Sequence, residues 1–184
     1  AQFEKAKGNQ IILSGKKYFD LSLHSGVLFL GHNHSTFSYT LKSILKKKIS
    51  ISDVKKKNIK KINELIRYYF KSTHKIIFCS TGSESVIKSI RICKAITNKK
   101  KIFLVNGSWH GSVDQTLFHS KRDLKPLPLS SGLDNQLINN VKILPYNDIE
   151  GSKKVLDKFA KEASCLIIEP ISASLPLEKS KKYL

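Results

Sequence analysis

The chain has 184 residues, a length that suits one ordinary domain with a sizeable core or half of a larger one. Hydrophobic residues make up 40% and charged residues 26%, a globular composition, and no apolar run approaches the roughly 20 residues of a membrane span. The net charge is +19, but 30 of the 33 basic residues are lysines spread along the whole chain. Arginine, which binds phosphate and guanine through paired hydrogen bonds, is scarce, so we expect solvated lysine faces and no specific nucleic-acid site.

The first part of the chain predicts a hairpin followed by helices. Apolar residues flank a Ser14-Gly15 turn, and further along they recur with helical spacing, including through the lysine-rich stretch. The expected elements, in order, are a hairpin at 11–21, a loop at 31–35 and helices at 36–48 and 53–70.

From Lys75 onward, short apolar runs alternate with helical patterns. The expected strands are 76–79, 102–105, 141–144 and 165–168; the expected helices are 83–97 and 149–162, with a short helix near 111–117. Strands separated by helices predict an α/β fold with a parallel, doubly wound sheet in three layers.

Neither the cysteines nor the histidines predict a metal site. Cys79, Cys93 and Cys165 lie among apolar residues without C-x-x-C spacing, so we expect reduced, buried thiols in a cytoplasmic protein. The histidines lack helical i,i+4 pairs with nearby carboxylates, the usual pattern of a metal site on a helix.

The segment 80–84 joins an expected strand to an expected helix through small residues. Thr81 and Glu84 have the spacing of a capping box, with Thr81 as the N-cap. The amides of Gly82 and Ser83 would then lack partners inside the helix and, with the helix dipole and the hydroxyls of Thr81 and Ser83, would favour a phosphate. Glycine at position 82 would also permit a left-handed φ and a close backbone approach. A capped helix without any ligand fits the same residues.

Two further polar segments follow expected strands, the edge at which ligands bind in open α/β sheets. In the first, glycines flank Trp109 and His110; the indole could lie flat against a planar ring, with His110 placed for a polar contact. Taken alone, a partly buried tryptophan that anchors the loop is the simpler interpretation. The second segment is 169–174.

Seven segments, in the same order and with similar spacing, resemble the class III, fold-type I aminotransferases that depend on pyridoxal 5′-phosphate. Residues 78–85 (FCSTGSES) are similar to the family's F-x-N-S-G-T-E-A, residues 107–111 (GSWHG) to G-x-Y-H-G, and residues 168–170 (IEP) to V-E-P. The other matching segments are 15–20, 30–34, 91–102 and 144–148. The resemblance runs from about residue 10 to the end and is greatest to the family's glutamate-1-semialdehyde 2,1-aminomutases.

The resemblance implies that seven residues surround the cofactor: Thr81, Gly82, Ser83, Trp109, His110, Glu169 and Ser174. The first three would hold its phosphate, and Trp109 would stack on its pyridine ring with His110 beside it. Glu169 would end the strand that flanks the ring, and Ser174 would lie near the cofactor's hydroxyl.

The resemblance also implies a small amino compound, or a keto or aldehyde compound, as substrate and a homodimer in the complete protein. It divides the chain into an N-terminal hairpin-and-helix segment at 1–50 and the first, incomplete part of the cofactor-binding large domain at 51–184. Ser25 stands where the aminomutases have a substrate-side tryptophan, so the sequence does not separate a mutase from a transaminase.

Two catalytic groups of the family have no counterpart in the sequence. The aspartate that pairs with the pyridine nitrogen and the lysine that links to the cofactor would come beyond residue 184, and Lys179, Lys181 and Lys182 follow Glu169 too soon to be that lysine. We therefore expect an N-terminal portion of a longer enzyme, with no catalytic residue of its own and a tendency to self-associate through an unpaired sheet edge. The alternative is a non-catalytic relic or a basic binding module with an acidic partner.

Overall fold

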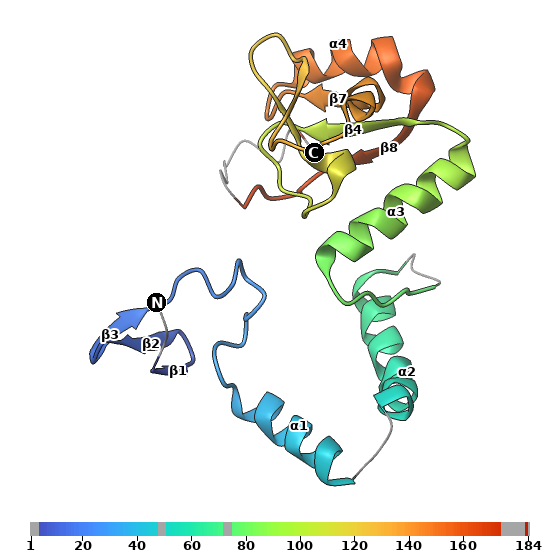
Figure 1. Cartoon of the computed structure of the whole chain (residues 1–184). Helices are drawn as coiled ribbons and strands as arrows, with labels where there is room; N and C mark the ends of the chain where they lie inside the picture. Colours follow the sequence, from blue (N-terminus) through green and yellow to red (C-terminus); the bar gives the residue numbers. More distant parts are fainter. Residues whose placement is uncertain (1–3, 48–50, 72–74, 174–182, 184) are drawn as a thin grey trace. The chain divides into compact units, whose positions relative to one another are not determined.

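The computed structural model describes residues 4–47, 51–71, 75–173 and 183, with the side chains of 51–57 left out (Figure 1). The contacts between residues divide the chain into two compact units, 1–76 and 77–184. The expected boundary at residue 50 stays a prediction. None of the described helices is both long and apolar enough to cross a membrane.

The N-terminal unit contains a small antiparallel sheet and two helices. Its elements are β1 (Lys5–Lys7), β2 (Gln10–Leu13), β3 (Lys16–Phe19), α1 (Ser35–Lys47) and α2 (Ile51–Tyr69). The expected hairpin is confirmed as β2 paired with β3, and both residues of its turn, Ser14 and Gly15, have positive φ, as a tight hairpin turn requires. Strand β1 was not expected, because its short, lysine-flanked run gives no apolar alternation.

A histidine ties the loop after the hairpin back to the small sheet. His32 forms an isolated antiparallel bridge with Gly8, and its Nε2 lies 2.7 Å from Asp20 Oδ2. The hydrogen bond from His32 is the main reason that the pKa of Asp20 lies below its ordinary value of 3.8. These contacts fix both ends of the loop between the hairpin and α1.

The C-terminal unit is built on a parallel sheet with strand order β7-β4-β8 (Figure 1). Its elements are α3 (Gly82–Thr97), β4 (Lys101–Val105), η1 (Asp114–Thr116), β5 (Phe118–Ser120), β6 (Pro126–Pro128), η2 (Asn135–Asn140), β7 (Val141–Leu144), α4 (Ile149–Phe159), η3 (Ala160–Glu162) and β8 (Ala163–Ile167). Three of the four expected parallel strands and both expected helices are therefore confirmed. The short helix expected near 111–117 is the single turn η1.

Alternate residues of the central strand face opposite layers, which is why β4 reads as one continuous apolar run. On one side, the core consists of Ile90, Ile102, Leu104, Phe118, Val141 and Ile143, which joins α3 and β5 to the sheet. On the other side, it consists of Phe103, Val105 and Leu144, packed against Val155, Leu156 and Phe159 of α4. The expected three-layer α/β arrangement is thus confirmed.

The strand expected at 76–79 is wrong. Residues 75–79 form no strand, and Ile77 and Phe78 are 62% and 38% exposed. A strand needs a partner for its backbone hydrogen bonds, and residues 76–79 pair with neither outer edge of the described sheet, which β7 and β8 form. An apolar run alone cannot supply that partner.

The cysteines are free thiols, but they are half-buried and not buried as expected. Cys93 on α3 and Cys165 on β8 line the same hollow of about 290 Å³, together with residues from both elements. Because β8 is an edge strand of the sheet, its outer side lacks the neighbour that would bury these thiols among the described residues.

Two isoleucines of this unit, one buried and one exposed, test the assignment of the core. Ile102 on β4 is 1% exposed and Ile96 on α3 is 79% exposed. Ile102→Ala should lower the free energy of unfolding by about 2–5 kcal/mol, because it removes buried methylene groups and leaves a cavity. Ile96→Ala should change it by less than about 0.5 kcal/mol. Urea unfolding followed by the fluorescence of Trp109, in the same unit, measures both, and equal effects would contradict the assignment of the core.

Candidate functional site

Helix α3 begins with a variant of the capping box, in which the glutamate reaches back to the residue before the N-cap. Thr81 is extended (φ −141°, ψ 159°), and its Oγ1 accepts a hydrogen bond from the amide of Glu84 at 3.1 Å. Glu84 Oε2 accepts one in return from the amide of Ser80 at 2.7 Å. Lys88, 2.6 Å from Glu84 Oε1, is the main cause that lowers the pKa of that carboxyl, so it stays charged. The helix therefore starts at a fixed residue.

The amides of Gly82 and Ser83 have no hydrogen-bond partner within the described part of the chain. They are the first two N–H groups of a 16-residue helix, where the helix dipole places positive potential. Two unpartnered amides and the hydroxyls of Thr81 and Ser83 on one turn can together bind an oxyanion.

Gly82 does not use the left-handed φ that glycine would permit. Gly82 is the first residue of α3, and its φ lies outside the left-handed range. A Cβ added there would meet nothing within 4 Å. The packing of the protein therefore does not require glycine at this position, and the space beside the backbone is open to a ligand.

The loop that follows β4 packs against the first turn of α3. The amide of Ser112 donates to Ser83 Oγ at 3.0 Å. Gly111 has a φ of +82°, and a Cβ added to it would lie 2.5 Å from Ser83 Oγ and 3.1 Å from Ser83 Cα. Sequence reasoning assigned no role to Gly111 or Ser112; the one available signal was the second glycine around the Trp109-His110 pair.

Asn106 fixes the beginning of this loop, and sequence reasoning missed it. Its side chain forms two hydrogen bonds with the backbone of Ser120 on β5: Oδ1 accepts from the amide at 2.9 Å, and Nδ2 donates to the carbonyl at 3.1 Å. Its own amide donates to the carbonyl of Leu144 at 2.8 Å. Asn106 thus joins the ends of β4 and β7 to β5.

Trp109 and His110 have opposite environments. The indole of Trp109 is 57% exposed, which leaves ring surface available to a planar ligand. His110 is only 8% exposed, and its Nε2 has no hydrogen-bond partner among the residues described. A buried polar atom left unpaired costs about 1–3 kcal/mol, so this nitrogen marks a place where a ligand atom or water is needed.

Glu169, two residues beyond β8, carries a second buried polar atom. Its Oε2 also lacks a partner within the described ranges. Burial lowers the pKa of His110 below its ordinary value of 6.5, and the negative charge of Glu169 partly offsets that shift. The imidazole is therefore neutral at pH 7 and lies within electrostatic reach of the carboxylate.

Six of the seven expected site residues lie in the described part of the C-terminal unit, at the start of α3 and beyond the carboxyl ends of β4 and β8. The contacts join Ser83 to the loop that carries Trp109 and His110, and electrostatics joins His110 to Glu169. Ser174 lies outside the described residues, as do Lys179, Lys181 and Lys182.

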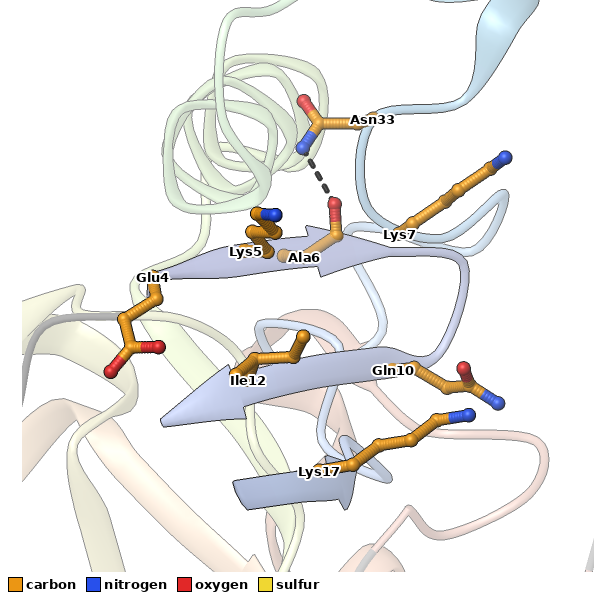
Figure 2. Close-up of a pocket in the computed structure, with 8 residues that line it drawn as sticks. All are labelled: Glu4, Lys5, Ala6, Lys7, Gln10, Ile12, Lys17 and Asn33. Carbon is orange, nitrogen blue, oxygen red and sulfur yellow. Dashed lines mark hydrogen bonds between the residues drawn. The ribbon is translucent and has the colours of Figure 1, made fainter. Parts of the chain in front are cut away.

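The N-terminal unit has a separate hollow of about 600 Å³ on its small sheet (Figure 2), larger than the 290 Å³ hollow beside Cys93 and Cys165. Lys5, Lys7 and Lys17 are among its lining residues, and Asn33 closes one side by donating from Nδ2 to the carbonyl of Ala6 at 2.8 Å. None of its described lining residues has a buried polar atom without a partner, in contrast to His110 and Glu169. The chemistry therefore points to the smaller polar cluster around α3.

The coupling of His110 to Glu169 can be measured by NMR titration of the imidazole. We expect the pKa of His110 below 6.5, and lower still in Glu169→Gln, because that substitution removes the negative charge that favours protonation. Since the folded state then binds this proton more weakly than the unfolded chain, His110 should destabilise the fold as the pH falls below 6.5. Glu162→Gln, which removes a carboxylate paired with Lys101 in the same unit, is the control. A pKa of His110 that rises in Glu169→Gln would contradict the coupling.

Comparison with known proteins gives a family and a fold. The family model described as "Aminotransferase class-III" matches residues 1–175 of the chain. The chain is 30% identical over 177 residues to a glutamate-1-semialdehyde 2,1-aminomutase from Wigglesworthia glossinidia brevipalpis, covering 94% of the chain and 40% of the relative. It is 31% identical to the protein of the same name from Archaeoglobus fulgidus, covering 98% and 43%. The chain thus spans about two fifths of the length of the curated relatives it matches.

Solved structures have the same fold. An omega-transaminase from Sphaerobacter thermophilus superposes with a TM-score of 0.84 at 22% identity, covering 98% of this chain and 44% of that one. A glutamate-1-semialdehyde-aminomutase from Pseudomonas aeruginosa in complex with PMP gives 0.73 at 14% identity, covering 93% and 38%. These likenesses confirm the fold-type I architecture. With the family match over nearly its whole length, the chain belongs to the class-III aminotransferases.

Proposed function

We propose that the complete protein uses pyridoxal 5′-phosphate to transfer an amino group on a small amino, keto or aldehyde compound, as a transaminase or an aminomutase. The observation that carries the proposal is the start of α3, which has the unpartnered amides of Gly82 and Ser83 and whose Ser83 hydroxyl contacts the loop that bears Trp109. Membership of the class-III family and the PMP-bound neighbour support pyridoxal phosphate as the group that occupies this site.

When bound, the cofactor supplies an electron sink that makes bonds at the substrate's amino-bearing carbon easier to break. The residues of this chain bind and orient it. The amides of Gly82 and Ser83 and the hydroxyls of Thr81 and Ser83 donate to its phosphate, whose charge the helix dipole also stabilises. The exposed face of Trp109 stacks on its ring.

The two buried, unpartnered atoms complete the site. His110 Nε2 and Glu169 Oε2 take polar contacts from the bound cofactor or its ordered water, which removes the cost of leaving them unpaired. Ser174 is proposed to lie near the cofactor's hydroxyl. No residue of this chain is proposed as a catalytic acid or base; the lysine and the aspartate of the family are assigned to the remainder of the enzyme.

We also propose a cytoplasmic homodimer for the complete protein. The N-terminal unit exposes several large apolar side chains; Leu21, Val27, Phe29 and Phe37 are among them and are 67–90% exposed. Val27, Phe29 and Phe37 line one hollow of about 480 Å³. An apolar surface of this kind is typical of one that another chain covers. The alternative of a basic binding module has no such support, because the lysines are spread along the whole chain.

The dimer proposal predicts the association state of the chain. Light scattering at 0.15 M salt should detect species larger than a monomer, because screening limits the repulsion of the +19 charge to about 8 Å. Phe29→Ser should shift the population toward monomer, whereas Ile96→Ser, an equally exposed site in the other unit, should not. A monodisperse monomer of the unmodified chain at high concentration would contradict the proposal.

The phosphate site predicts the effect of removing one amide. Gly82→Pro deletes the N–H at the first helical position, where proline is tolerated, and the extended Thr81 before it suits a following proline. Gly82→Ala is the matched control, because it adds a Cβ into open space and keeps the amide. Pyridoxamine 5′-phosphate should bind Gly82→Pro about tenfold more weakly than Gly82→Ala. Calorimetric titration measures both, and equal affinities would remove the support for phosphate at this turn.

A further inference from the structure

We propose that Gly111 and the amide of Ser112 are positioning elements that turn the Ser83 hydroxyl into a fixed donor toward the cofactor's phosphate. The inference rests on the proposed function, since it assigns the orientation of one group in the same site. It concerns two residues that make no contact with the cofactor themselves and act only through Ser83.

The hydrogen-bond capacity of Ser83 sets its orientation. A hydroxyl has one hydrogen to donate and two lone pairs that accept. One lone pair of Ser83 Oγ is taken by the Ser112 amide at 3.0 Å. The hydroxyl donates to no acceptor within the described part of the chain, so its hydrogen is available for an anion. A phosphate oxygen only accepts at neutral or basic pH, and is the complementary partner.

The Ser112 amide also selects the rotamer of Ser83. A free serine side chain has three staggered χ1 positions, and a hydrogen bond to a fixed backbone group favours one of them. Ser112 belongs to the loop that follows β4, and Asn106 anchors the start of that loop to β5 and β7. The donor to Ser83 is therefore held by the sheet and not by α3 itself.

Gly111 is the residue that permits this contact. Any Cβ at position 111 would approach Ser83 Oγ to 2.5 Å and Ser83 Cα to 3.1 Å, and the second atom is backbone that a rotamer change cannot move. The φ of +82° is also unfavourable for other residues. A side chain at this position must therefore displace the loop, and with it the Ser112 amide, from Ser83.

The experiment compares two ligands on the unmodified chain and its variants. Pyridoxamine 5′-phosphate and pyridoxamine share a ring and differ in the phosphate, and neither carries the aldehyde that would react with the 30 lysines. Trp109 is the only tryptophan, so quenching of its fluorescence reports binding at the proposed ring position. The measured quantity is the ratio of the two dissociation constants, pyridoxamine over its phosphate, which isolates the contribution of the phosphate.

Four variants complete the design. Ser83→Ala should reduce the ratio by about tenfold or more, because a hydrogen bond to a charged group is lost. Gly111→Ala should reduce it by about tenfold, and the double variant should lose little beyond Ser83→Ala, because both act through one hydroxyl. Gly132→Ala is the matched control: its φ is +86°, but a Cβ there meets nothing within 4 Å. It should leave the ratio unchanged.

The outcomes separate this inference from the proposed function. A ratio near one in the unmodified chain would overturn the phosphate site and the inference with it. A high ratio that Gly111→Ala leaves unchanged, or lowers additively with Ser83→Ala, would overturn the positioning role alone. If Gly111→Ala does not fold, amide hydrogen exchange of Ser112 in the unmodified chain decides: the phosphate ligand should slow it more than pyridoxamine does. Equal exchange with both ligands would overturn the inference.

Discussion

The backbone ladder on both sides of β4 is the constraint on which the C-terminal unit depends. β4 pairs in parallel with β7 from Ile102 opposite Val141, and with β8 from Lys101 opposite Ala163, with a register shift before Ile102. Residues 102–105 are at most 3% exposed, because each face of the strand carries a helical layer. A strand fixed on both edges and both faces delivers its carboxyl end, and hence the loop 106–112, to one defined place.

The candidate site follows from that placement. The loop after β4 reaches the first turn of α3, where the capping box has already fixed which amides remain without partners. Glu169 lies within electrostatic reach of His110 because β8, which precedes Glu169, is the direct neighbour of β4 in the sheet. The polar groups are thus held by the scaffold before any ligand binds, which lowers the entropy that binding must remove. The same groups leave two buried atoms unpaired, the kind of local cost expected at a functional site.

Features determined by neighbouring residues could be predicted from the sequence. The N-cap at Thr81, the hairpin turn at Ser14-Gly15 and the central strand at 102–105 depend on local chemistry or on one apolar run, and the structure has all three. The short strands β5 and β6 were missed, since two prolines bound β6 and hide any strand pattern.

Features that depend on distant partners could not be predicted. The run 76–79 has the apolar character of a strand, yet the described sheet gives it no neighbour. The contact of Ser83 with Gly111 and Ser112 joins residues about 30 positions apart, and no spacing rule announces it. At Gly82, a glycine suggested a special φ, whereas the structure has an ordinary helix start with open space beside it. The sequence therefore predicts which residue types form the site. It does not predict the contacts through which the loop after β4 holds Ser83.

The proposed function requires the first turn of α3 to bind the phosphate of a pyridoxal cofactor. The most direct measurement is the backbone amide spectrum of the isotopically labelled chain during titration with pyridoxamine 5′-phosphate and, separately, with pyridoxamine. We expect the phosphate ligand to move the Gly82 and Ser83 amide protons downfield, as new hydrogen bonds to an anion require, whereas pyridoxamine should leave them nearly unmoved. Saturating binding of the phosphate ligand with both amide resonances unchanged would contradict it.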